Sequence, residues 1–135
     1  MTHRRLRILI CEDDERLATL VMETLAADER FDVVARATNG EEAIHLAEQH
    51  APDVVLMDIG MPGLDGIDAT RAIRERNASQ HVVIYTGSGE YEDIGRADAA
   101  GAAGFLHKEA LTSPDLPNAI EVLHTNYVSA RPDPD

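Results

Sequence analysis

Five short apolar runs recur along the chain, and each is separated from the next by a segment with helical periodicity. In those segments apolar residues return every three or four positions, which is the spacing of an amphipathic helix. Strands that alternate with helices are typical of a parallel sheet, because two parallel strands need a long crossover between them. The runs occupy residues 6–11, 31–35, 54–57, 81–85 and 103–107. We therefore expect an α/β fold, a doubly wound five-stranded parallel sheet between two layers of helices.

Local signals predict helix ends and the extent of the domain. Asp14 precedes a helical pattern that starts at Glu15, so its carboxylate can cap that helix. Residues 38–41 (Thr-Asn-Gly-Glu) resemble a capping box that opens a second helix. Residues 1–128 are expected to form one domain with one core. Residues 129–135 contain two prolines and two aspartates, and we expect a disordered tail or the start of a linker there.

The composition limits what this domain can bind. Its 135 residues carry a formal net charge of −13, which speaks against nucleic-acid binding because phosphate contacts need clustered cations. The same charge disfavours anionic membrane surfaces, and no apolar run approaches the roughly 20 residues of a membrane helix. The sequence shows no secretion-signal pattern, and its single cysteine, Cys11, allows no internal disulfide. We expect a cytoplasmic protein without direct nucleic-acid or membrane binding.

Polar and charged side chains stand where the predicted strands end. Asp13 and Asp14 follow the first run, and Asp58 ends the third. Thr86 ends the fourth run, and Lys108, the only lysine of the chain, follows the fifth. Binding sites of open parallel sheets form at the carboxyl ends of the strands. We therefore expect these five residues to gather in one pocket.

This combination of side chains fits phosphoryl transfer. Three converging carboxylates repel one another, and a hard divalent cation such as Mg²⁺ relieves that repulsion. A carboxylate beside Mg²⁺ can attack a phosphoryl group in line. Asp58 is the best candidate nucleophile because it ends the central strand, while Lys108 and Thr86 can bind the transferred phosphoryl oxygens. Each residue alone also fits an ordinary role, such as helix cap or turn former, but the five together favour the functional interpretation.

The same residues resemble the receiver family of two-component response regulators. Residues 11–14 (Cys-Glu-Asp-Asp) are similar to the family's acidic pair after the first strand. Residues 57–66 (Met-Asp-Ile-Gly-Met-Pro-Gly-Leu-Asp-Gly) resemble its phosphoacceptor segment, which is a highly specific signal. Thr86 and Lys108 stand where the family has its hydroxyl and its lysine, and Phe105 stands where it has its aromatic switch residue.

The resemblance spans residues 5–127 and implies a CheY-like, flavodoxin-like (βα)5 fold, a three-layer sandwich with strand order 2-1-3-4-5. It implies that a sensor histidine kinase donates a phosphoryl group to Asp58. The implied Mg²⁺ ligands are Asp13, Asp14, Asp58 and the backbone carbonyl of Gly60. Such a domain is a signalling phosphoacceptor rather than an enzyme. It phosphorylates itself from a phosphodonor and loses the group slowly.

The resemblance also implies a conformational switch. Thr86 and Phe105 would shift inward on phosphorylation; the alternative for Phe105 is a static core aromatic. A phosphoryl group can only bias an equilibrium between two states through contacts that differ between them. A homodimer that forms on phosphorylation is a further expectation.

One departure from the family pattern follows the lysine. Many receivers have proline there, often after a cis bond, whereas this chain has Glu109. A cis bond before a residue other than proline costs about 2.5–4 kcal/mol, so we expect a trans bond and a locally different loop. Residues 104–110 instead resemble LuxR-type (NarL-like) transcriptional regulators, which continue into a DNA-binding domain. The output is then either transcription through such a domain, absent from this chain, or protein contacts of a stand-alone receiver or phosphorelay.

Other functional classes fit less well. A phosphatase of the haloacid-dehalogenase type needs a second acid two residues after its nucleophile, and this chain has Gly60 there. A flavin-binding flavodoxin would place phosphate against Asp13 and Asp14, which repel it. The six histidines include no pair with the i, i+4 spacing of a zinc helix. A degenerate receiver that works without phosphorylation should lack a pocket residue, and none is missing.

Overall fold

A parallel sheet forms the centre of the molecule. The computed structural model describes residues 4–87 and 91–131. The strands are β1 (Leu6–Cys11), β2 (Phe31–Ala37), β3 (Val54–Asp58), β4 (His81–Thr86) and β5 (Phe105–His107). Their order in the sheet is β2-β1-β3-β4-β5, and every neighbouring pair is parallel. This confirms the expected α/β fold and its strand order.

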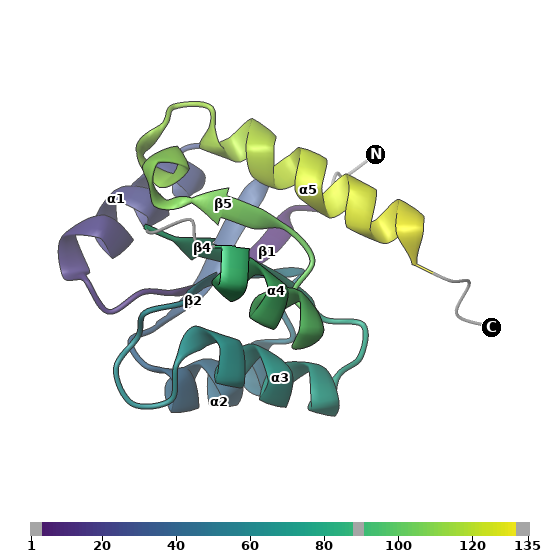
Figure 1. Ribbon diagram of the computed structural model, residues 1–135. Helices are drawn as coiled ribbons and strands as arrows, with labels where there is room; N and C mark the ends of the chain where they lie inside the picture. The colour runs from purple at the N-terminus through teal and green to yellow at the C-terminus, as the bar shows by residue number, and fades with distance from the viewer. Residues whose placement is uncertain (1–3, 88–90, 132–135) are drawn as a thin grey trace.

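Helices cover both faces of the sheet. They are α1 (Glu15–Ala26), α2 (Gly40–His50), α3 (Gly66–Arg76), α4 (Tyr91–Ala99) and α5 (Leu116–Ala130), with a 3-10 helix η1 (Lys108–Thr112) after β5. Figure 1 shows α5 along the top of the molecule, and α2 and α3 along the bottom. None of the helices in the described ranges is long and apolar enough to cross a membrane.

Each face of the sheet has its own apolar core, and β3 contributes to both. Val55 and Met57 pack in the core shared with α2, α3 and α4. Val54 and Leu56 pack in the core shared with α1 and α5. Successive side chains of a strand point to opposite faces, so a strand between two helical layers must be apolar at every position. That requirement explains the unbroken apolar run before Asp58.

The register of the strands aligns their carboxyl ends. Cys11 lies opposite Met57, and Asp58 lies opposite Tyr85. At the next strand, Thr86 lies opposite His107. The residues that follow β1, β3, β4 and β5 therefore emerge at one edge of the sheet.

The structure tests two expectations for the C-terminal part of the chain, the loop after Lys108 and the tail from residue 129. No cis peptide bond occurs in the described ranges, so the bond between Lys108 and Glu109 is trans, as expected. The chain then turns directly into η1. Helix α5 continues to Ala130, two residues into the segment expected to be a tail. Residues 132–135 of that expected tail lie outside the described residues.

Candidate functional site

Three carboxylates meet at the carboxyl edge of the sheet. One oxygen each of Glu12, Asp13 and Asp58 lies within 4.8 Å of the others. Glu12 and Asp58 are buried, with 1% and 5% of their surface exposed, whereas Asp13 is exposed. The cluster is thus enclosed by protein on one side and open to solvent on the other. Negative charge crowded in this way is expected to bind a cation.

Asp58 is held in place by its own backbone and by helix α3. Its Oδ1 accepts a hydrogen bond from the N–H of Gly60 at 3.1 Å. The first residue of α3, Gly66, packs so tightly that a Cβ there would lie 2.2 Å from the Asp58 carbonyl oxygen. The Ile59 N–H also bonds the Tyr85 carbonyl at 3.2 Å. These contacts hold the backbone around Asp58 and one oxygen of its carboxylate, while Oδ2 lies 4.0 Å from the Lys108 ammonium.

Lys108 supplies the positive charge. Its Nζ lies 4.0 Å from Asp58 Oδ2. This distance is an ion pair and is too long for a direct hydrogen bond. The lysine side chain is 41% exposed, so solvent screens the pair. Its ammonium can therefore reach a group bound at Asp58 without first breaking a strong hydrogen bond.

Glu12 is the most buried acid of the cluster. Its Oε2 accepts the N–H of Asp14 at 2.9 Å, and its Oε1 accepts the hydroxyl of Tyr85 at 2.8 Å. Burial raises the pKa of Glu12, the two hydrogen bonds oppose that rise, and the charge of Asp58 adds to it. Burial also raises the pKa of Tyr85, so its phenol remains a donor at neutral pH.

Asp14, predicted as a metal ligand, lies outside the carboxylate cluster. Its Oδ1 accepts the N–H groups of Arg16 at 2.9 Å and Leu17 at 3.3 Å, which caps α1. The structure thus brings Glu12 together with Asp13 and Asp58, where the sequence interpretation had Asp14. The reason is the position of the helix start, which takes Asp14 as its cap. The cap preference of aspartate before Glu15 was the signal that could have identified Glu12 instead.

Gly60 stands beside the Asp58 carboxylate, as its N–H bond requires. A Cβ on Gly60 would lie 3.9 Å from Asp58 Oδ1, so a side chain there would border the pocket. Its carbonyl as a metal ligand remains a prediction.

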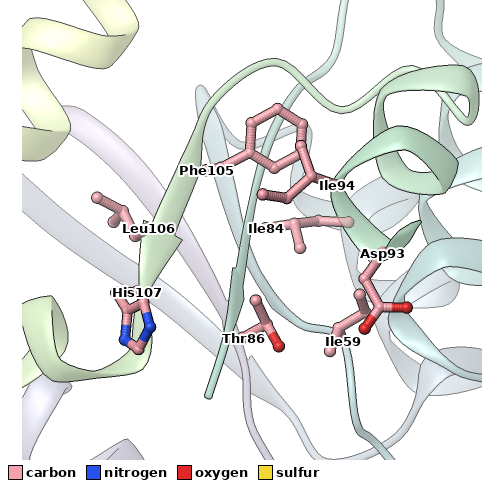
Figure 2. A pocket seen from close by; sticks show the side chains of 8 residues that line it. All are labelled: Ile59, Ile84, Thr86, Asp93, Ile94, Phe105, Leu106 and His107. Atoms are coloured by element: carbon pink, nitrogen blue, oxygen red, sulfur yellow. The ribbon is translucent and has the colours of Figure 1, made fainter. Parts of the chain in front are cut away.

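Thr86 and Phe105, the predicted switch residues, line one cavity of about 180 Å³ between β4, β5 and α4. Figure 2 shows the Phe105 ring beside Ile94, with Thr86 further down the same cavity near Ile59. Thr86 is 8% exposed, whereas Phe105 is partly exposed. An apolar cavity between them provides room for the aromatic ring to move. Movement itself remains a prediction.

Residues 8–121 match the family model described as "Response regulator receiver domain". The chain belongs to this family. A receiver domain is a signalling phosphoacceptor rather than a catalyst, and receiver domains pair with histidine kinases. The triad of Glu12, Asp13 and Asp58 is typical of the Mg²⁺ site of receivers.

Individual relatives agree with this assignment. The receiver is 38% identical to "Chemotaxis protein CheY" of Halobacterium salinarum over 76% of this chain and 83% of that protein. It is 36% identical to "Nitrate/nitrite response regulator protein NarL" of Escherichia coli, over 76% of this chain. The matched part is 47% of NarL, so the receiver corresponds to about half of that longer relative.

The fold is also found in solved receivers. The signal receiver domain of the putative response regulator NarL from Mycobacterium tuberculosis superimposes with a TM-score of 0.83 at 27% identity. That match covers 96% of this chain and 100% of the other. The observed strand order and helix placement are therefore those of the family.

Proposed function

We propose that this receiver accepts a phosphoryl group on Asp58 from a sensor histidine kinase in the cytoplasm. The observation that carries the proposal is the juxtaposition of the carboxylate triad with Lys108, whose Nζ lies 4.0 Å from Asp58 Oδ2. A structural acid at a strand end would need neither the other two carboxylates nor a lysine. The donor set is all oxygen and open on one side, which fits Mg²⁺ because that ion keeps several of its waters.

The residues would divide the work as follows. Glu12, Asp13 and Asp58, with the carbonyl of Gly60, would hold Mg²⁺, with Glu12 on the buried side. Bound Mg²⁺ supplies positive charge to the phosphoryl oxygens. An Asp58 carboxylate oxygen attacks phosphorus while the bond to the donor nitrogen of the kinase histidine breaks in line. Lys108 and the Thr86 hydroxyl would bind the oxygens of the transferred group.

Phosphorylation of the isolated chain tests this proposal. The protein is incubated with acetyl phosphate and Mg²⁺, and its intact mass is measured. We expect a gain of one phosphoryl group, which chelation of Mg²⁺ or the variant Asp58→Asn abolishes. Asp68→Asn is the matched control, because Asp68 is a half-buried acid on α3 that pairs with Arg71. Equal labelling of Asp58→Asn, or none of the wild type, would refute the assignment.

The output is proposed to be transcriptional control through a LuxR-type DNA-binding domain. Support comes from the longer NarL relative and from the LuxR-like sequence of residues 104–110. The alternative is a stand-alone receiver, which the similarity to CheY favours. The coding sequence beyond Asp135 decides between them, since a helix-turn-helix pattern there would establish the first. Homodimerisation on phosphorylation can be followed by light scattering with beryllofluoride as a stable phosphoryl mimic.

A further inference from the structure

Glu12 differs from the other two acids of the triad because protein groups already bond both of its oxygens. The Asp14 N–H bonds Oε2 at 2.9 Å, and the Tyr85 hydroxyl bonds Oε1 at 2.8 Å. A carboxylate has about four acceptor positions, so each oxygen keeps capacity for another partner. The two hydrogen bonds orient the plane of the Glu12 carboxylate, and with it the acceptor positions that remain available to a bound ion.

Tyr85 reaches this acid from the buried side of the sheet. Its side chain is 1% exposed and packs in the core beneath α1 and α5. Its hydroxyl oxygen also lies 3.2 Å from the Cys11 carbonyl. A phenol has one hydrogen, and the closer, charged acceptor is the Glu12 carboxylate. The phenol thus donates to Glu12, and strand β4 holds the tyrosine in the position from which it donates.

The same tyrosine also contacts the phosphoacceptor strand. Tyr85 lies opposite Asp58 in the sheet, and its carbonyl accepts the N–H of Ile59 at 3.2 Å. The next residue along β4 is Thr86. One residue therefore ties Glu12, which follows β1, to the backbone that carries Asp58.

We propose that Tyr85 is a positioning residue whose hydroxyl orients the Glu12 carboxylate so that the acidic triad binds Mg²⁺. This inference rests on the proposed function, because it concerns the same site. Without the hydroxyl, Oε1 loses its buried donor, and the carboxylate turns away from the orientation shared with Asp13 and Asp58. Hydrogen-bond partners behind metal-binding acids typically account for about 10–100-fold in metal affinity.

The variant Tyr85→Phe tests the proposal because it removes one oxygen and keeps the ring. Mg²⁺ is titrated into the purified chain without phosphodonor, and heat is measured. We expect the Mg²⁺ dissociation constant to rise about 10-fold. Tyr127→Phe is the matched control. Its hydroxyl also makes two hydrogen bonds, with Arg74 and the Ser79 carbonyl, but away from the triad. The Mg²⁺ affinity of Tyr127→Phe should equal that of the wild type.

A double-mutant cycle separates positioning from a general structural role. If Tyr85 acts through Glu12, the change Tyr85→Phe should cause no further loss in a Glu12→Gln background. An equal loss in both backgrounds, or a folded Tyr85→Phe variant whose affinity stays within about twofold of the wild type, overturns the inference. A loss in Tyr127→Phe as large as that in Tyr85→Phe also overturns it.

A second measurement needs no variant to fold. Mg²⁺ bound at the triad polarises the Glu12 carboxylate, whose Oε1 accepts the Tyr85 hydrogen bond. That hydrogen bond should change, so the near-ultraviolet absorption of tyrosine in the wild type should shift. Mg²⁺ binding without such a shift overturns the positioning role alone. Absence of Mg²⁺ binding by the wild type overturns the proposed function and this inference together.

Discussion

At the carboxyl end of the sheet buried carboxylates face one another, whereas at the amino end a buried histidine faces a second histidine and a tyrosine. His81, the first residue of β4, is 1% exposed. Its ring stacks on Tyr127 of α5 at a centroid distance of 4.1 Å and an interplanar angle of 4°. Its Nδ1 lies 3.0 Å from Nδ1 of His124, also on α5. The cluster therefore attaches α5 to the sheet.

The partners of the histidine cluster define its protonation. His81 Nε2 contacts the carbonyl of Ala103, which can only accept, so Nε2 carries the hydrogen. Nδ1 of neutral His81 then accepts, and His124 must carry its hydrogen on Nδ1. Burial lowers the pKa of His81 to about 4, which keeps it neutral at pH 7. Both ring nitrogens of His81 thus have a matching hydrogen-bond partner.

At the carboxyl end of the sheet, donors and acceptors are not matched in this way. Glu12, Asp13 and Asp58 present acceptors to one another, and Lys108 is too exposed to neutralise them. A closed set of neutral hydrogen bonds stabilises the fold, whereas crowded charge of one sign costs stability and provides a binding site. The difference separates the structural end of this domain from its functional end.

The largest effect should follow from disturbing the packing that holds Asp58. Gly66→Ala would place a Cβ 2.2 Å from the Asp58 carbonyl oxygen and 2.9 Å from the Ile59 Cα, which are backbone atoms that cannot rotate away. We expect a loss on the order of 3 kcal/mol in unfolding free energy, measured by urea denaturation. Gly95→Ala in α4 meets nothing within 4 Å and should gain roughly 0.5–1 kcal/mol. Equal stability of the two variants would contradict this packing.

The second largest effect should be a loss of unfolding free energy at acidic pH, caused by His81 at the amino end of the sheet. His81 has a pKa of about 6.5 when unfolded and about 4 when folded, so between these values the unfolded chain binds the additional proton. Stability is therefore fully present above pH 6.5 and falls toward pH 4, by up to about 3 kcal/mol. His81→Gln lacks this ionisation, so its unfolding free energy relative to the wild type isolates the effect. A constant difference from pH 7 to 4 would show that His81 protonates freely in the folded domain.

Variants at Asp14 and Asp13 should show that the first residue caps a helix and the second binds the metal ion. Asp14→Ala removes the α1 cap and should cost about 1 kcal/mol in unfolding free energy, with unchanged Mg²⁺ affinity. Asp13→Ala should weaken Mg²⁺ binding with little loss of stability. Calorimetric titration and thermal unfolding of both variants check this pair. Loss of Mg²⁺ binding in Asp14→Ala at full stability would restore Asp14 as a ligand.

The smallest expected effect is a gain. Asp58→Asn removes one charge from the triad and should raise the unfolding free energy by roughly 0.5–1 kcal/mol in Mg²⁺-free buffer. Saturating Mg²⁺ stabilises only a protein that binds it, so it should abolish or reverse the gain. Thermal unfolding with and without Mg²⁺ measures this. A loss of stability in Mg²⁺-free buffer would mean that the carboxyl end is balanced like the amino end.

Two sequence interpretations at strand–helix junctions selected a neighbouring residue, two positions away for the metal ligand and one position away for the helix cap. The metal ligand expected at Asp14 is replaced in the cluster by Glu12. The capping pair expected within residues 38–41 is Asn39 with Glu42, whose N–H the Asn39 side chain accepts at 2.8 Å. The start of α1 was predicted correctly at Glu15, but the sequence did not show that Asp14, once it caps this helix, lies outside the cluster. Helix α2 starts one residue later than the Thr-x-x-Glu pattern indicates, because sequence patterns locate helix ends only to about one or two residues.

The sequence by itself determined the alternation of strands and helices, and with it the edge at which Asp13, Asp58 and Lys108 meet. Chain order and the handedness of the crossovers leave few other arrangements. Only the tertiary structure decided which acids face the pocket, that Tyr85 stands behind Glu12, and that His81 meets His124 and Tyr127. Such contacts join residues far apart in the chain, and their geometry depends on register and packing that no local pattern contains.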